Sequence, residues 1–356
     1  MASSWTNPLQ ALAVVTDHPA RAASEALSEA LSSTVLDPEG FDKARQEARK
    51  KIEEYQPVDS RDDTAALLEI LLDKLPKEGQ MALASDIETS DLRLLRNHLV
   101  DAILKPMKLA GGNQPITEPS SNLAGMEQIE SSLHEIEPSK RNQTRLKQDC
   151  LQRDGFRCSI SGHYDWSSLE EGKVALPADG RLTITQCAHI LPFALSDFDE
   201  RVATETRNKA IIWFALHRYF PELRDKIDTS TINNHANLIT MDASLHSAFG
   251  QYRIGFWPAE RDNTYYIRSH GGLPLPAIIS KGQEFVHFIS HDPQIPLPDI
   301  DFLKTHCRIG EILRVSGIGQ RIEKEVENSL QDPSNLRPDG STNLWSIMER
   351  KMLINV

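Results

Sequence analysis

The first hundred or so residues carry apolar positions at helical spacing. In "SRDDTAALLEILLDKL", residues 60–75, apolar residues recur every three or four positions, Ser60 is a candidate N-cap, and two aspartates favour the first turn. The segment "SDLRLLRNHLVDAILKPMKL", residues 90–109, repeats this spacing until Pro106, which we expect to end or kink the helix. A charged segment, residues 40–56, predicts a further helix with little to bury. The pattern therefore predicts a helical N-terminal region.

The periodicity changes beyond residue 180. An apolar, β-branched run is typical of a strand, whereas apolar residues at spacings of three and four indicate a helix. The chain accordingly alternates as strand, helix, strand, short helix and strand, and becomes mostly helical from about residue 282. Asp242 is an N-cap candidate for the short helix, and Gly250 is its C-terminal stop. The segments are "RLTITQCAHILPF" (181–193), "ATETRNKAIIWFALHRYFPELRDKI" (203–227), "ANLITM" (236–241), "DASLHSAFG" (242–250), "QYRIGFWP" (251–258) and "RIGEILRVSGIGQRIEKEVENSL" (308–330).

Gly, Pro, Ser and Asn concentrate in "AGGNQPITEPSSNLAG", residues 110–125, as they do in linkers. We therefore expect an α+β protein with four parts. These are an acidic helical N-terminal region (1–110), a linker with a short helix (111–138), a central domain of strands and helices with a basic arm (139–275) and a helical C-terminal region (276–356).

The composition is that of a soluble globular protein, with 39% hydrophobic and 25% charged residues. No window approaches the roughly 18 consecutive apolar residues of a membrane-spanning helix, so we expect no membrane partner. The N-terminal residues lack the features of a secretory signal, and the four cysteines are scattered. We therefore expect an intracellular protein, nuclear or cytoplasmic.

The net charge of −12 argues at first against a nucleic-acid partner, because a polyanion needs local positive potential. The acidity, however, lies almost entirely in residues 1–138, which carry 13 basic and 24 acidic residues; the remainder carries 26 and 27. The arm "SKRNQTRLKQDCLQRDGFR", residues 139–157, has six basic and two acidic residues. It is a candidate phosphate-facing surface, although so short a charge run is more often a solvated helix face.

Three short motifs stand in order in the central region: "CAHILPF", "NLITMDASLHSAFG" and "YRIGFWP". Together they resemble the HNH endonuclease domain in the form found in many fungal proteins, a member of the His-Me finger (ββα-metal) nucleases. The resemblance covers roughly residues 148–260. In fungal members a helix like "IIWFALHRYF" commonly separates the two halves. The resemblance implies a central ββα-metal module with an inserted helix, between the two helical regions.

The resemblance implies a metal-dependent endonuclease that hydrolyses phosphodiester bonds, with DNA as the expected substrate. It makes His189 the general base, Asn237 the residue that orients the base or its loop, and His246 a ligand of one divalent cation, Mg²⁺ or similar. A histidine suits the base because its unperturbed pKa of about 6.5 lies near the working pH. The cation would stabilise charge on the phosphate and the leaving oxygen. Candidate phosphate contacts in the arm are Arg145, Lys147, Arg153 and Arg157.

Each site residue also has a plainer interpretation. An isolated histidine in an apolar run, as at His189, is more often a hydrogen-bonded core residue. Asn237 competes with the polar residues 233–235 and also suits a turn. Asp242 lies four residues before His246 on the same helix face and is a candidate metal ligand, with the N-cap role favoured.

Two departures from the family pattern bear on activity. Many enzymes of the superfamily have an acidic residue or a second histidine directly before the base, where this chain has Ala188. The zinc-containing members have CxxC where this chain has "RCSISG", so we expect no structural zinc and small buried roles for Cys158 and Cys187. The nearest replacements for the missing metal ligand are Asp242, Asp197, Asp199 and His235.

The alternative function is a catalytically reduced His-Me finger that binds nucleic acid or protein, which Ala188 and the acidic N-terminal region favour. The same acidic region is a candidate docking surface for a protein partner. The segment "RVSGIGQRIEKEVE", residues 314–327, resembles the phosphate-binding loop of a helix-hairpin-helix. We favour the simpler interpretation that Ser316 and Gly317 end one helix and start another.

Overall fold

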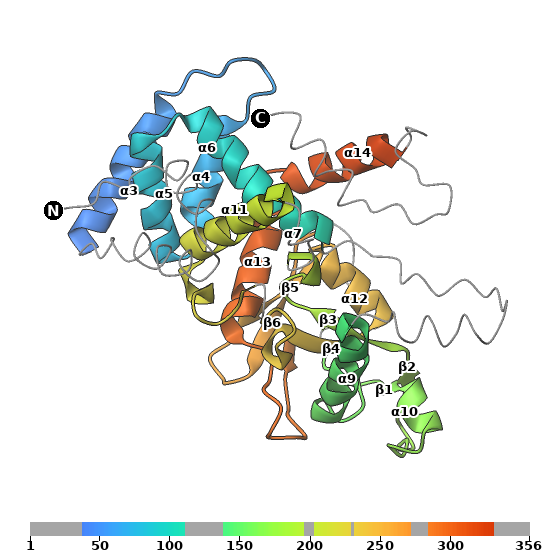
Figure 1. Cartoon of the computed structure of the whole chain (residues 1–356). Helices are drawn as coiled ribbons and strands as arrows, with labels where there is room; N and C mark the ends of the chain where they lie inside the picture. Colours follow the sequence, from blue (N-terminus) through green and yellow to red (C-terminus); the bar gives the residue numbers. More distant parts are fainter. Residues whose placement is uncertain (1–37, 111–137, 196–202, 229–230, 272–283, 331–356) are drawn as a thin grey trace.

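The computed structural model describes residues 38–110, 138–195, 203–228, 231–271 and 284–330, and the fold is given for these ranges (Figure 1). They form helices and small sheets, an α+β fold. Every helix within these ranges is too short or too polar to cross a membrane.

The N-terminal helices follow the apolar pattern closely. Four leucines at helical spacing, Leu67, Leu68, Leu71 and Leu72, are buried on one side of α4. Pro106 does not end the helical segment, because a π-helical turn precedes it and the proline falls in the first turn of α7, where a missing N–H is tolerated. The helices are α3 (Pro38–Glu53), α4 (Thr64–Lys74), α5 (Lys77–Thr89), α6 (Leu92–Leu99), η1 (Val100–Leu104) and α7 (Lys105–Ala110).

The expected order of strand, helix, strand, short helix and strand is confirmed. Strands β3 (Thr185–His189) and β4 (Leu238–Asp242) pair antiparallel, with His189 opposite Leu238. Helix α12 (Ala243–Gly250) packs against both strands. Between the strands run η2 (Phe193–Leu195), α11 (Ala203–Tyr219), η3 (Pro221–Leu223) and η4 (His235–Asn237).

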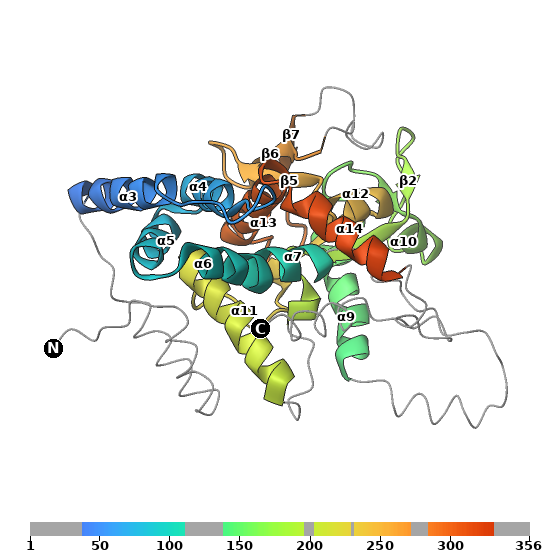
Figure 2. The same cartoon turned by 90° about the horizontal axis from the view of Figure 1, so that it is seen from above.

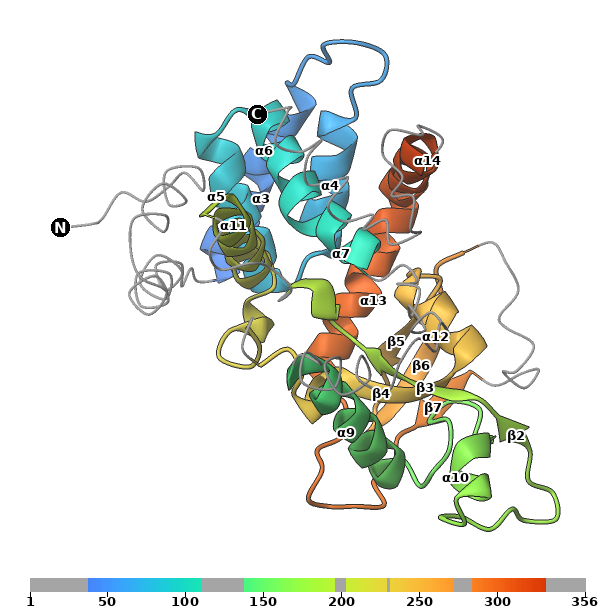
Figure 3. The ribbon, with the colours of Figure 1, turned by 45° about the vertical axis from the view of Figure 1, so that its right-hand side comes forward.

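Helix α9 (Pro138–Arg153) packs on the same strand pair as α12 (Figure 3). Gln186 of β3 contacts α12, whereas the next residue, Cys187, contacts Cys150 of α9. Because neighbouring residues of a strand point to opposite faces, the two helices cover opposite faces of the pair. A short parallel pair with its helix adjoins this unit: β1 (Tyr164–Asp165), α10 (Trp166–Glu170) and β2 (Leu182–Thr183).

A third sheet has the strand order β5-β6-β7 and is antiparallel throughout. Its last strand lies in the part of the chain that we expected to be helical. Helix α13 packs against β5, and α14 follows after a break at Ser316 and Gly317, as favoured above. The elements are β5 (Ile254–Pro258), β6 (Thr264–Ser269), β7 (Phe285–His287), α13 (Ile300–Val315) and α14 (Ile318–Leu330).

The N-terminal helices share one hydrophobic core with the rest of the described chain, and Figure 2 shows α5 and α6 beside α11. Asp86 of α5 is fully buried and accepts hydrogen bonds from Arg218 and Tyr219 of α11 at 2.6–2.8 Å. The backbone of Gly79 approaches Tyr219 so closely that a Cβ would lie 2.0 Å from its carbonyl oxygen. The inserted helix α11 is therefore held between the N-terminal helices and the rest of the described chain.

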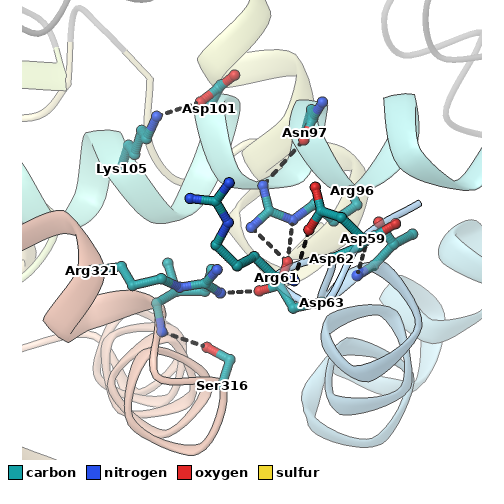
Figure 4. A network of polar contacts seen from close by, with 12 residues as sticks. Asp59, Arg61, Asp62, Asp63, Arg96, Asn97, Asp101, Lys105, Ser316 and Arg321 are labelled. Carbon is teal, nitrogen blue, oxygen red and sulfur yellow. Dashed lines mark hydrogen bonds and ion pairs between the residues drawn. The ribbon is translucent and has the colours of Figure 1, made fainter. Parts of the chain in front are cut away.

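Ion pairs also attach the C-terminal helices to the N-terminal ones. Asp63, just before α4, binds both Arg96 of α6 and Arg321 of α14 (Figure 4). Lys74 of α4 lies 2.6 Å from Glu311 of α13. Asp63, an acidic residue of the N-terminal region, thus has its partners within the chain.

Candidate functional site

His189 is the last residue of β3 and is half-buried. Its Nε2 atom lies 2.9 Å from Oδ1 of Asn233, and its ring centroid lies 5.7 Å from that of Phe193. An amide oxygen only accepts hydrogen bonds, so Nε2 carries the proton in this pair. The lone pair that can take a proton is then on Nδ1.

His246 lies in the first turn of α12 and faces β3. Its Nδ1 atom is 2.5 Å from Oε1 of Gln186. By the same reasoning Nδ1 donates to the amide oxygen, and the lone pair of His246 is on Nε2. This is the tautomer that a metal ligand bound through Nε2 requires.

Burial lowers the pKa of both imidazoles below the usual value of 6.5. For His189 the Asn233 hydrogen bond partly opposes this shift, and the nearby His246 adds to it because two imidazolium charges would repel. Both rings are therefore neutral at neutral pH. A neutral imidazole is the form that accepts a proton or binds a cation.

Asn237 is fully buried between β3 and β4. Its Oδ1 accepts a hydrogen bond from the backbone N–H of Leu191 at 2.8 Å, and its Nδ2 donates to the carbonyls of Leu191 and Ile232 at 2.9 Å. The side chain thus joins the segment that follows His189 to the segment that precedes β4. It lies where a residue that orients the loop of the base would lie.

Asp242 has the N-cap arrangement. Its Oδ1 accepts hydrogen bonds from the backbone and hydroxyl of Ser244, and its Oδ2 is bound by the hydroxyl of Thr183. Desolvation opposes the charged form, but these hydrogen bonds outweigh it and lower the pKa of the carboxyl. Asp242 therefore has the N-cap role that the sequence favoured, with Oδ1 at the start of α12 and Oδ2 engaged by Thr183 of β2.

Of the other candidates for a second ligand, only His235 lies among the described residues. His235 is engaged with Asp149 of α9, at 3.0 Å from Nε2 to Oδ2. Asp197 and Asp199 lie outside the described residues. Over the ranges that the structure describes, no three His, Cys, Asp or Glu side chains form a group that could hold a metal ion. Among the described residues, the two histidines are hydrogen-bonded to the amides of Gln186 and Asn233.

Arg153 is the clearest correction to the expected nucleic-acid surface. Its side chain has no solvent exposure and forms a bidentate pair with Asp154 at 2.7 and 2.9 Å. It also donates to the carbonyls of His235, Leu238 and Pro296 at 2.9–3.0 Å. The guanidinium therefore connects the end of α9, the start of β4 and the segment before α13, and it cannot reach a phosphate.

The remaining basic candidates are closer to solvent. The side chain of Arg145 is 83% exposed, with Asp149 4.0 Å away in the same helix. Lys147 is half-buried on the same helix. Arg157 is half-buried and places its guanidinium 3.0 Å from Nε2 of His291. These three side chains stay candidates for phosphate contact.

Gln186 and Asn233 were not singled out as functional from the sequence. Asn233 competes with Asn237 in the sequence, and the structure gives them separate positions, Asn233 on His189 and Asn237 on the backbone of Leu191. Gln186 carries no signal in the sequence, because its relation to His246 depends on how α12 packs against β3. Cys158 is buried, with Sγ 3.4 Å from the backbone nitrogen of Ser161, and Cys187 is half-buried.

Residues 158–256 match the family model described as HNH endonuclease. The matched range begins at Cys158 and ends in β5, so it includes β3, α11, β4 and α12. It is shorter than half of the chain. No match was found among curated proteins or among solved structures. The match supports an HNH-family protein, as the three motifs indicated.

Proposed function

We propose that the chain is a metal-dependent HNH-type endonuclease that hydrolyses phosphodiester bonds of DNA, with β3, β4 and α12 as its ββα-metal finger. The main support is a pair of neutral imidazoles at this finger. The lone pair is on Nδ1 in His189 and on Nε2 in His246. The match of residues 158–256 to HNH endonucleases adds to it.

In this proposal His189 is the general base. Nδ1 takes a proton from water, the oxygen of that water attacks phosphorus, and the bond to the leaving oxygen breaks. The lowered pKa of His189 keeps Nδ1 unprotonated at neutral pH, and the Asn233 hydrogen bond holds the ring while Nδ1 becomes charged. Asn237 holds the loop after the base through Leu191.

His246 would hold the divalent cation through Nε2. A cation would supply positive charge beside the scissile phosphate and the leaving oxygen. The residues present fit an ion bound by a single imidazole, because Gln186 selects the required tautomer and burial keeps the ring neutral. Water and phosphate oxygens would complete its shell. Arg145, Lys147 and Arg157 would contact the DNA backbone.

The alternative is a catalytically reduced finger that binds nucleic acid or a protein partner. Two observations favour it: Ala188 precedes the base, and both oxygens of Asp242 are already hydrogen-bonded, one as a helix cap and one to Thr183. The acidic N-terminal region stays a candidate docking surface for a protein partner. The two functions differ in whether a phosphodiester bond is cut.

The test is nicking of supercoiled plasmid by the full chain with Mg²⁺ or Mn²⁺, with an RNA substrate in parallel. The variants are His189→Ala and His246→Ala, and His163→Ala is a control outside the pair. Metal-dependent nicking that is lost in both site variants and kept in the control supports the endonuclease. Wild-type protein that cuts neither substrate with any metal, while its variants remain folded, contradicts the endonuclease in favour of the alternative.

A further inference from the structure

Three aromatic residues form a row across the sheet of β5, β6 and β7. Trp257 of β5 is directly opposite Tyr266 of β6, which is directly opposite Phe285 of β7. Residues that are directly opposite in antiparallel strands point to the same face, so the three rings lie on one side of the sheet. The three strands lie side by side in Figure 3.

The other face of the sheet is part of the hydrophobic core. Phe256, Tyr265 and Val286 alternate with the aromatic row and are buried. The rings of Phe256 and Phe249 stack at 5.6 Å, which joins this face to α12. The sheet that carries the aromatic row is therefore packed on its opposite face.

Two arginine side chains lie close to the aromatic rings. The guanidinium of Arg268 lies 5.2 Å from the ring centroid of Tyr266, and that of Arg308 lies 4.9 Å from Trp257. The rings of Tyr266 and Phe285 are 4.5 Å apart. Phe285 is 44% exposed, Arg268 is exposed and Tyr266 is half-buried, so this end of the row is open to solvent. The three strands contain no aspartate or glutamate.

We propose that Tyr266, Phe285 and Arg268 form a binding surface for an unpaired stretch of nucleic acid. Bases stack on aromatic rings whatever their sequence, and arginine binds the phosphates between them. An unpaired strand is favoured over a duplex because the base faces in a duplex are already covered by their neighbours. The three strands contain no carboxylate, and the guanidinium groups of Arg268 and Arg308 lie near the rings, so this surface complements a polyanion. The proposal rests on the proposed function, because it assumes a nucleic-acid substrate.

The test is fluorescence anisotropy with the full chain in EDTA, so that no strand is cut. The probes are a labelled oligothymidine of about 12 nucleotides and the same strand paired with oligoadenine, since binding sites for single strands cover about 4–16 nucleotides. The variants are Tyr266→Leu, Phe285→Leu and Arg268→Gln. Leu94→Ala, at an exposed apolar position on α6, is the control, and Phe285→Trp keeps a ring.

We expect tighter binding of the single strand than of the duplex, and about tenfold weaker single-strand binding in each of the three variants. Leu94→Ala and Phe285→Trp should bind like the wild type. Equal affinity of wild type and folded Phe285→Leu, or no single-strand binding by the wild type, overturns the proposal. Plasmid nicking tests the catalytic site separately. If the protein nicks plasmid but does not bind the single strand, the proposed binding surface is wrong and the proposed endonuclease function is unaffected.

Discussion

The amide oxygen of Gln186 accepts a hydrogen bond from Nδ1 of His246, across the contact between β3 and α12. The partner of this imidazole is thus a neutral amide. A carboxylate at the same position would add a negative charge. The amide therefore fixes the tautomer of His246 but adds no negative charge that would attract the proposed cation.

Replacing this amide should change metal affinity in a predictable direction. In Gln186→Glu, the carboxylate should raise the pKa of His246 and strengthen binding of Mn²⁺ without nucleic acid by about tenfold, because its charge, acting through the Nδ1 hydrogen bond, makes the Nε2 lone pair more basic. Gln186→Leu should weaken binding, since the tautomer is no longer selected. Isothermal titration calorimetry with Mn²⁺ measures both; equal affinities in the three proteins would exclude a metal role for this pair.

Removal of the Asn237 side chain should destabilise the fold. Asn237→Ala leaves the N–H of Leu191 and two buried carbonyls without partners, which costs about 2–4 kcal/mol of the free energy of unfolding. The measurement is urea unfolding followed by circular dichroism. Asn234→Ala, which removes a single hydrogen bond to Ala236, is the matched control and should cost about 1 kcal/mol or less. Similar losses in the two variants would contradict the role assigned to Asn237.

Substitution of two arginines of α9 should have different effects on stability and DNA binding. Arg153→Ala breaks a buried ion pair and leaves several carbonyls unpaired, so we expect a loss of about 3–5 kcal/mol in the free energy of unfolding or failure to fold. Arg145→Ala should leave stability within about 0.5 kcal/mol, because its side chain is mostly exposed. It should instead weaken DNA binding and lower its salt dependence. Thermal melts and binding at two salt concentrations decide; a stable Arg153→Ala protein would refute the structural role.

The buried histidines should make the fold sensitive to acid. Burial lowers the pKa of His98 and His270 to about 4 and that of His306 to about 3. The folded state therefore binds fewer protons than the unfolded state below pH 6.5, and stability falls as the pH drops from 6.5 towards 4. Each group should cost on the order of 2 kcal/mol by pH 5.

Urea unfolding at pH 7 and pH 5 measures this loss. His98→Leu removes one of the three groups together with a buried Nε2 that has no hydrogen-bond partner. It should change stability little at pH 7 and reduce the loss at pH 5 by roughly a third. An unchanged pH dependence in this variant would show that His98 is not the source.

The amino-acid sequence by itself determined the order of elements from β3 to β5 and the two motifs that contain His189, Asn237 and His246. These features are local, because periodicity, capping and short-range spacing follow from each segment alone. The N-cap of α12 by Asp242 and the helix break at Ser316 are of this kind.

Only the tertiary structure decided which polar side chains meet. Gln186 and His246 are 60 residues apart, and Asp86 and Arg218 are 132 residues apart, so no local pattern indicates either pair. The burial of Arg153 likewise depends on segments that converge on α9 from positions 82 to 143 residues away. A basic residue in a helical charge run has the same local sequence whether its guanidinium faces water or the carbonyls of distant strands, because packing between elements settles the difference.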